Sequence, residues 1–187
     1  MRHPIAGWPL WAWLLAASAL GVVLGLLAGR WAEGGAAPAA WRGAVRRVID
    51  GDTLVAAGRR GPVTVRLAGI DAPERAQPCG PEAKAALLAH APPGEEVAVR
   101  HIGVWTHGRP VAWVAARPGP AAPLERDLSL LMVRSGHAYP YPGKPCYPRC
   151  AELAAAEEEA RAARRGCWAA GEPERPWAYR ERTMGKR

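Results

Sequence analysis

Two short acidic motifs carry residues suited to binding a hard cation. Asp50, Asp52 and Thr53 lie in the first motif, and Asp71 and Glu74 lie in the second, so that Asp71 follows Asp52 by 19 positions. The two aspartates can supply carboxylate oxygens to Ca²⁺, which takes roughly six to eight oxygen ligands and leaves room for water. Glu74 is close enough in the sequence to act on such a water as a general base. The motifs therefore predict a metal site beside a proton acceptor.

Two arginines add the chemistry of phosphate binding. Arg66 lies between the acidic motifs, and Arg109 follows Gly108 further along the chain. A guanidinium presents a planar fork that can bind a phosphate through two hydrogen bonds and stabilise developing negative charge. Arg66 alternates with Val65 and Leu67 in a predicted strand, so its side chain points away from the core. We therefore expect Arg66 to face a groove, as part of a phosphodiesterase site.

Five short motifs resemble those of a known family in their residues and in their order along the chain. The motifs are residues 48–53 (VIDGDT), 65–74 (VRLAGIDAPE), 79–83 (CGPEA), 108–109 (GR) and 165–168 (RGCW). Together they resemble the thermonuclease (staphylococcal nuclease-like) family, over about residues 44–168 of this chain.

The resemblance implies a calcium-dependent, sugar-non-specific nuclease that acts on DNA and RNA and leaves 5′-hydroxyl and 3′-phosphate ends. Carried over by position, it implies Ca²⁺ ligands, catalytic residues and residues that shape the site. The Ca²⁺ ligands are Asp52, Asp71 and the backbone carbonyl of Ala72; the catalytic residues are Arg66, Glu74 and Arg109; the shaping residues are Asp50 and Thr53.

One loop departs from the family pattern. The family places an acidic residue, a basic residue and a Tyr before the Gly-Arg pair, whereas this chain has Trp105, Thr106 and His107. We expect His107 to replace the phosphate hydrogen bond of that Tyr, and the alternative is a tolerated loop substitution. Tyr139 and Tyr141 are predicted to stack on nucleobases, which all present a π-face; the alternative is that both tyrosines only pack their loop.

The composition is compatible with a polyanionic partner. The chain has 187 residues and a formal net charge of +8, and residues 41–187 keep a net charge of +7. An excess of this size favours nucleic acid or an anionic membrane surface as a partner, although a chain rich in arginine for other reasons would show it too.

The N-terminal segment is predicted to cross a membrane. The 26 residues from Pro4 to Gly29 carry no charge, and about 20 apolar residues are enough to span a bilayer as a helix. We assign residues 1–31 as a signal-anchor or transmembrane segment and residues 32–42 as a flexible linker. The expected location is the cell membrane, single-pass, with the nuclease domain outside the cytoplasm. The alternative is a cleaved signal peptide and a secreted protein.

The remaining chain predicts an α+β fold, a five-stranded OB-fold β-barrel with about three α-helices. Strands are predicted at residues 44–49, 52–57, 62–68, 95–102 and 109–116, and helices at 81–90, around Leu124 to Met132, and at 149–165. Such a barrel binds its ligand across one face. Residues 43–170 form the predicted domain, expected to be monomeric, and residues 171–187 form a basic C-terminal tail.

The four cysteines suit disulfides better than zinc, because an exported domain normally oxidises its thiols. Cys150 and Cys167 bracket a predicted helix and would lie about 25 Å apart, so they cannot bond each other. Two pairings remain: Cys79 with Cys167 and Cys146 with Cys150, or Cys79 with Cys150 and Cys146 with Cys167. We favour the first, because the second requires Cys146 to reach the far end of the helix. A set of four free buried thiols is the third possibility.

Two other functions compete with a nuclease. One is a catalytically inactive nucleic-acid-binding OB-fold module at the cell envelope, and the other is a structural envelope protein. A binding module gains nothing from two carboxylates directed at a polyanion, because their repulsion weakens binding unless a cation neutralises them. A structural role explains none of the motifs. Both acidic motifs and both arginines therefore favour the enzyme.

Overall fold

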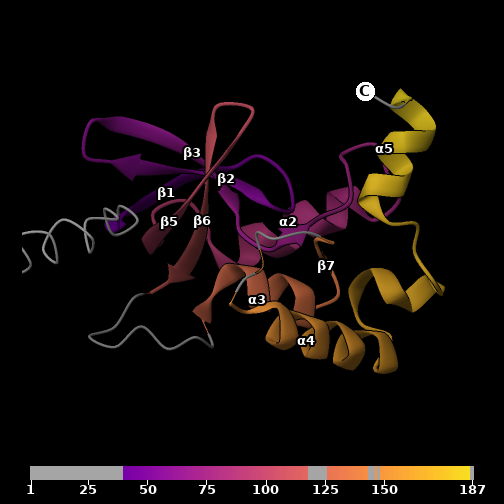
Figure 1. Ribbon diagram of the computed structural model, residues 1–187. Coiled ribbons are helices and arrows are strands. Elements are labelled where there is room, and N and C mark those ends of the chain that lie inside the picture. The colour runs from indigo at the N-terminus through magenta and orange to yellow at the C-terminus, as the bar shows by residue number, and fades with distance from the viewer. Residues whose placement is uncertain (1–39, 118–125, 143–145, 147, 186–187) are drawn as a thin grey trace, which may run out of the picture. The chain divides into compact units, whose positions relative to one another are not determined.

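The computed structural model describes residues 40–117, 126–142, 146 and 148–185 (Figure 1). The predicted transmembrane segment and most of the predicted linker lie outside the described residues. Within the described part of the chain, none of the helices has the length and apolar character needed to cross a bilayer.

A closed five-stranded barrel forms the first half of the domain. Its strands are β1 (Ala40–Val48), β2 (Thr53–Gly58), β3 (Gly61–Leu67), β5 (Glu96–Thr106) and β6 (Arg109–Ala116). They hydrogen-bond in the order β1-β2-β3-β6-β5, and β5 closes the barrel against β1. All neighbours are antiparallel except β3 and β6, which pair in parallel with Arg66 opposite Val111. The five predicted strands are confirmed, with ends shifted by up to four residues.

The barrel closes around small and branched side chains that alternate along the strands. Its buried residues include Val45, Leu54, Val65, Leu67, Val97, Val99, Val111 and Val114. The alternation that predicted the direction of Arg66 holds: Val65 and Leu67 are buried, while the Arg66 side chain is 20% exposed. Burial of these aliphatic groups is the main favourable term for a barrel of this size.

Among the described residues, four α-helices and a short 3₁₀ helix follow or interrupt the strands. They are α2 (Gly80–His90), α3 (Leu128–Arg134), α4 (Cys150–Ala162), the 3₁₀ segment η3 (Gly166–Ala170) and α5 (Pro176–Met184). Figure 1 shows α3 and α4 side by side below the barrel. The Asp127 carboxylate caps α3 by accepting a hydrogen bond from the Leu130 amide at 3.1 Å. Of the predicted helix around Leu124 to Met132, Leu124 lies outside the described residues.

The structure corrects the C-terminal end of the prediction in two places. The helix predicted to run to Arg165 ends at Ala162, because Arg164 adopts a left-handed conformation with φ 51°. Residues 171–187 are not simply a tail, since α5 occupies Pro176–Met184 with its proline in the first turn. A small second sheet, β4 (Ile70–Asp71) with β7 (Tyr139–Pro140), was also not predicted.

A buried ion pair joins the barrel to the helices. Arg149, at the start of α4, contacts Asp127 at 2.8 Å, and both side chains are about 6–7% exposed. The Arg149 guanidinium also lies 4.9 Å from the ring centroid of Trp113 on β6. Burial raises the pKa of Asp127, and attraction to Arg149 opposes that shift. Removing Arg149 would leave the buried charge of Asp127 uncompensated, which is costly.

Both favoured disulfides are present. Cys79–Cys167 joins the N-terminus of α2 to η3, across 88 positions of sequence. Cys146–Cys150 closes a short loop at the start of α4, across four positions. The first pairing expected from the sequence is therefore confirmed, and no described cysteine is left as a thiol.

Candidate active site

Arg66 holds the two predicted metal-binding aspartates together. Its two terminal nitrogens donate to the Asp52 carboxylate at 2.8 Å and to the Asp71 carboxylate at 2.6 Å. Asp52 also accepts from the Thr53 hydroxyl at 2.8 Å and from the Ala72 amide at 3.1 Å. Both carboxylates are almost fully buried. Residues from both acidic motifs thus meet at one guanidinium.

Two glycines allow the acidic motifs to approach. Gly69 turns the chain between β3 and β4 with φ +75°, so that Arg66 and Asp71 can bond across the turn. A Cβ on Gly51 would lie 2.7 Å from the Cβ of Ala72, so only glycine lets the two motif backbones come this close. Asp50 shapes the first motif by accepting a 3.2 Å hydrogen bond from the Asp52 amide.

Glu74 lies at the edge of this cluster and is held by two contacts. Its side chain is 34% exposed and accepts a 2.7 Å hydrogen bond from Arg180. Its amide donates to the side chain of Gln77 at 3.1 Å, and Gln77 in turn donates to the backbone of Glu174 at 2.7 Å. Gln77 is buried and was not predicted as a site residue. It ties the loop of the proposed base to the segment before α5.

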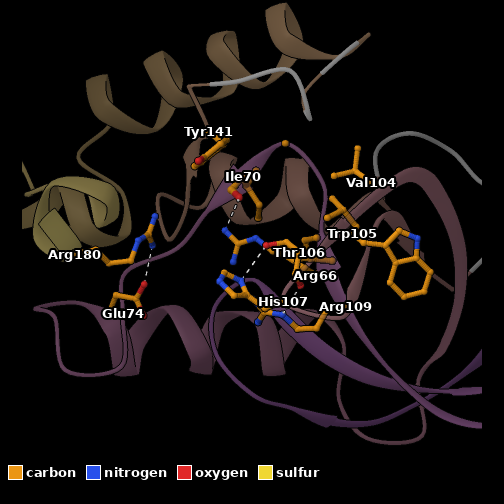
Figure 2. Close-up of a pocket in the computed structure, with 13 residues that line it drawn as sticks. Arg66, Ile70, Glu74, Val104, Trp105, Thr106, His107, Arg109, Tyr141 and Arg180 are labelled. Atoms are coloured by element: carbon orange, nitrogen blue, oxygen red, sulfur yellow. Dashed lines mark hydrogen bonds and ion pairs between the residues drawn. The ribbon is translucent and has the colours of Figure 1, made fainter. Parts of the chain in front are cut away.

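The predicted phosphate ligands share one cavity of about 520 Å³. Figure 2 shows Arg66, His107 and Arg109 together in the middle of this cavity, with Glu74 and Arg180 facing each other at its side. His107, with φ 48°, and Gly108 form the turn between β5 and β6. The His107 ring lies 3.1 Å from the Thr106 hydroxyl, and Trp105 at the cavity rim is 62% exposed.

The two tyrosines predicted to stack on bases have different environments. Tyr141 lines the cavity and is 38% exposed, with Trp177 of α5 at its edge. Tyr139 is fully buried, edge-on to Trp168, with the Arg175 guanidinium 4.7 Å from its ring centroid. The structure therefore corrects the expectation for Tyr139, because its ring has no face open to a base.

Arg180 is a residue of the site that the sequence did not reveal. From α5 it donates to Asp71 at 2.7 Å and to Glu74 at 2.7 Å, and it lines the same cavity as Arg66 and Arg109. The available signal was Pro176, which is typical of a first helical turn and places Arg180 in a helix. Nothing in the local sequence indicates its partners more than 100 positions away.

The charges of the cluster perturb one another. Burial raises the pKa of Asp52, and attraction to Arg66 opposes the shift. Burial disfavours the charged form of Arg66, but attraction to Asp52 and Asp71 outweighs it and raises the pKa of the guanidinium. For Arg180 too, burial is outweighed by the hydrogen bonds to Asp71 and Glu74, so its pKa is also raised. Both arginines stay cationic at every pH at which the protein is folded.

The donor set is composed of oxygen. Asp52, Asp71 and the carbonyl of Ala72 offer carboxylate and carbonyl oxygens, which suit Ca²⁺ and Mg²⁺ rather than softer metals. Among the described residues, no three His, Cys, Asp or Glu side chains gather in a way that could hold a metal ion. Asp52 and Asp71, both bonded to Arg66, are the two carboxylates that a cation at this place would share.

Several known proteins are similar to this chain over most of its length. The model of the family described as "Staphylococcal nuclease homologue" matches residues 64–170. Protein ParB of Escherichia coli is 34% identical over 186 residues, which cover 95% of this chain and 96% of that protein. Micrococcal nuclease of Shigella flexneri is 36% identical over 171 residues, covering 89% and 91%. A protein of Escherichia coli O157:H7 named "Uncharacterized endonuclease" is 33% identical over 140 residues, covering 75% and 85%.

Proposed function

The chain belongs to the staphylococcal nuclease homologue family, and on that premise we propose that it is a calcium-dependent, sugar-non-specific nuclease. It hydrolyses phosphodiester bonds in DNA and RNA and leaves 3′-phosphate ends. One observation carries the proposal: Arg66 bonds both Asp52 and Asp71, on a cavity shared with Glu74 and Arg109. Relatives that carry nuclease and endonuclease in their names support the reaction class.

The residues present fit a hard divalent cation. Asp52, Asp71 and the Ala72 carbonyl would hold it, because oxygen donors of this kind are the ligands that Ca²⁺ prefers. When bound, the cation supplies charge stabilisation for a phosphate oxygen and lowers the pKa of a coordinated water.

The side chains of Glu74, Arg66 and Arg109 accept the proton and bind the phosphate. A Glu74 carboxylate oxygen takes the proton of the attacking water, and its partial exposure to the cavity lets it reach that water. Arg66 uses three N–H donations to reach Asp52, Asp71 and the Ile70 carbonyl, which leaves two of its five N–H groups for a phosphate oxygen. Arg109, across the cavity, donates to a second oxygen of the same phosphate. The activated water attacks the phosphorus in line with the bond to the 5′ oxygen. That bond breaks, and the 5′ oxygen leaves and ends as a hydroxyl group.

The cavity rim supports binding to both DNA and RNA. Trp105 and Tyr141 offer exposed aromatic surface beside the arginines. Stacking on bases is tolerant of sequence and does not require a 2′-hydroxyl. His107, in the same rim, replaces the hydrogen bond that the family's tyrosine makes to a phosphate.

Export to the outside of the cytoplasmic membrane completes the proposal. The uncharged N-terminal residues suit a membrane anchor, or a signal peptide in the secreted alternative. Two disulfides are typical of an oxidising compartment.

The test is cleavage of plasmid DNA and of RNA by the full-length protein with Ca²⁺, and then with EGTA. We expect both substrates to be cleaved only with Ca²⁺, and the products to be labelled by a kinase at their 5′-hydroxyl ends without prior phosphatase treatment. Equal cleavage in EGTA would contradict the calcium requirement. Tight binding of DNA without cleavage under any condition would favour the inactive binding module.

A further inference from the structure

Arg180 reaches the candidate active site from outside the residues that the family model matches. The matched residues end at 170, and α5 begins at Pro176. Yet the Arg180 guanidinium contacts Asp71 at 2.7 Å and 3.3 Å and Glu74 at 2.7 Å. One arginine therefore bonds both a proposed metal ligand and the proposed general base.

The two oxygens of Asp71 are both engaged by guanidinium groups. Arg66 donates to Oδ1 and Arg180 donates mainly to Oδ2. A divalent cation that binds Asp71 needs an oxygen lone pair and must tolerate the nearby positive charges. Like charges a few ångströms apart repel strongly in a partly buried site. Cation binding is therefore favoured when one of the arginines moves away from Asp71.

Arg180 is the less tightly held of the two arginines. Arg66 extends from a barrel strand, is 20% exposed, and also donates to Asp52 and to the Ile70 carbonyl. Arg180 is 32% exposed and comes from α5, and within the described residues its hydrogen bonds go to the two carboxylates. Its release leaves the barrel unchanged.

The helix that carries Arg180 is held in place beside the site. Arg175, just before α5, contacts Glu157 and lies over the rings of Tyr139 and Trp168 at 4.7 Å and 5.0 Å. The Glu174 carbonyl, two positions before α5, accepts a 2.7 Å hydrogen bond from the buried side chain of Gln77. This anchoring keeps the Arg180 guanidinium at a high local concentration near Asp71, so its competition with a cation is intramolecular.

We propose that Arg180 caps Asp71 and Glu74 in the metal-free protein and must be displaced when the divalent cation binds. The C-terminal helix thereby sets the metal affinity of the site. This inference rests on the calcium site of the proposed function, and it assigns to Arg180 a role that the matched family residues do not contain.

Calorimetric titration of the full-length protein with CaCl₂, without nucleic acid, tests the proposal. Arg180→Gln removes the competing charge, and we expect it to bind Ca²⁺ on the order of tenfold more tightly than wild type, or more. Arg180→Lys keeps the charge but loses the two-pronged geometry, so its affinity should fall between the two. Arg182→Gln is the matched control on the same helix. The Arg182 side chain is 62% exposed, and among the carboxylates of the described residues it bonds only Glu174. We expect this variant to bind Ca²⁺ with the affinity of wild type.

Each result bears on the proposal in a distinct way. Ca²⁺ affinity that is unchanged or weaker in Arg180→Gln overturns it, while the calcium site itself stands. Absence of Ca²⁺ binding by wild type and by all variants overturns the proposed calcium dependence and this inference with it. If circular dichroism shows that Arg180→Gln does not fold, the test depends on Arg180→Lys. A Ca²⁺ affinity of Arg180→Lys equal to or below that of wild type would then refute the proposal.

Discussion

Arg180 and Glu74, 106 positions apart in the sequence, are joined by a 2.7 Å hydrogen-bonded ion pair. The contact fixes the carboxylate of the proposed base at the side of the cavity, where Figure 2 shows the two side chains facing each other. A residue beyond the matched family domain thus takes part in orienting a residue inside it.

Replacing the proposed base should separate catalysis from binding. In Glu74→Gln the side chain can still accept a hydrogen bond from Arg180, but it cannot take a proton from water. We expect turnover on DNA to fall by about 10²-fold or more, while affinity for single-stranded DNA is retained. Steady-state kinetics and fluorescence anisotropy measure the two effects. Glu82→Gln, the same change on the exposed face of α2, should leave both unchanged.

The geometry of Arg66 should matter more than its charge. Lysine in Arg66→Lys supplies one ammonium, which cannot bridge Asp52 and Asp71 as the guanidinium does. We expect turnover to fall by at least about tenfold and the free energy of unfolding by about 1–3 kcal/mol, through lost charged hydrogen bonds. Urea denaturation and initial rates provide the measurements. Arg60→Lys, in the exposed turn between β2 and β3, is the control, and wild-type turnover in Arg66→Lys would show that the site is wrongly assigned.

The two disulfides should differ in their contribution to stability. A cross-link over 88 positions restricts the unfolded chain far more than one over four positions. Loop-entropy estimates give about 4–5 kcal/mol for Cys79–Cys167 and about 2 kcal/mol for Cys146–Cys150. Thermal unfolding of the two double Cys→Ser variants checks this ranking. An equal loss in both variants would mean that strain or residual structure, rather than loop length, decides the effect.

Two histidines should make the fold sensitive to mild acid. Burial lowers the pKa of His90, and repulsion by the nearby His137 lowers it further. Burial also lowers the pKa of His137, although attraction to Glu82 opposes that shift. Both groups bind protons more weakly in the folded than in the unfolded state, whose pKa is about 6.5. Their contribution to stability is therefore present above about pH 6.5 and is lost as the pH falls below it.

The melting temperature measured between about pH 7.5 and 5.5 tests this pair. We expect it to decrease on acidification in wild type, and to decrease less in His90→Gln, which removes both a titrating group and its repulsion of His137. His101→Gln, on the barrel surface, is the matched control. An identical pH dependence in wild type and His90→Gln would exclude His90 as the cause.

The barrel could be predicted from the sequence because its signals are local. Alternation of Val63, Val65 and Leu67 with Thr64 and Arg66 defines a strand and the direction of its arginine. The acidic motifs likewise contain the two glycines, Gly51 and Gly69, that let the motif backbones approach each other. These features depend on residues within one strand or within two motifs about 20 positions apart.

The features that were missed depend on distant partners. Strands β4 and β7 have two residues each, too few for a periodic pattern, and they pair only because the fold brings Asp71 beside Tyr139. Tyr139 is buried by Trp168 and Arg175, which come from later segments. The α5 segment is polar and lacks an apolar stripe, so its composition resembles a tail. Tertiary contacts override such local appearance.

The order of synthesis gives the position of Arg180 a further consequence. Domains fold from the N-terminal end as the chain is made, at about 5–20 residues per second. Arg180 is added 71 residues after Arg109, which corresponds to roughly 4–14 s at those rates. Over that interval the nascent chain contains Asp52, Asp71 and Glu74 together with Arg66 and Arg109. It does not yet contain Arg180, whose guanidinium bonds Glu74 in the complete fold. A product released early by a premature stop codon before residue 180 would carry those catalytic residues permanently uncovered.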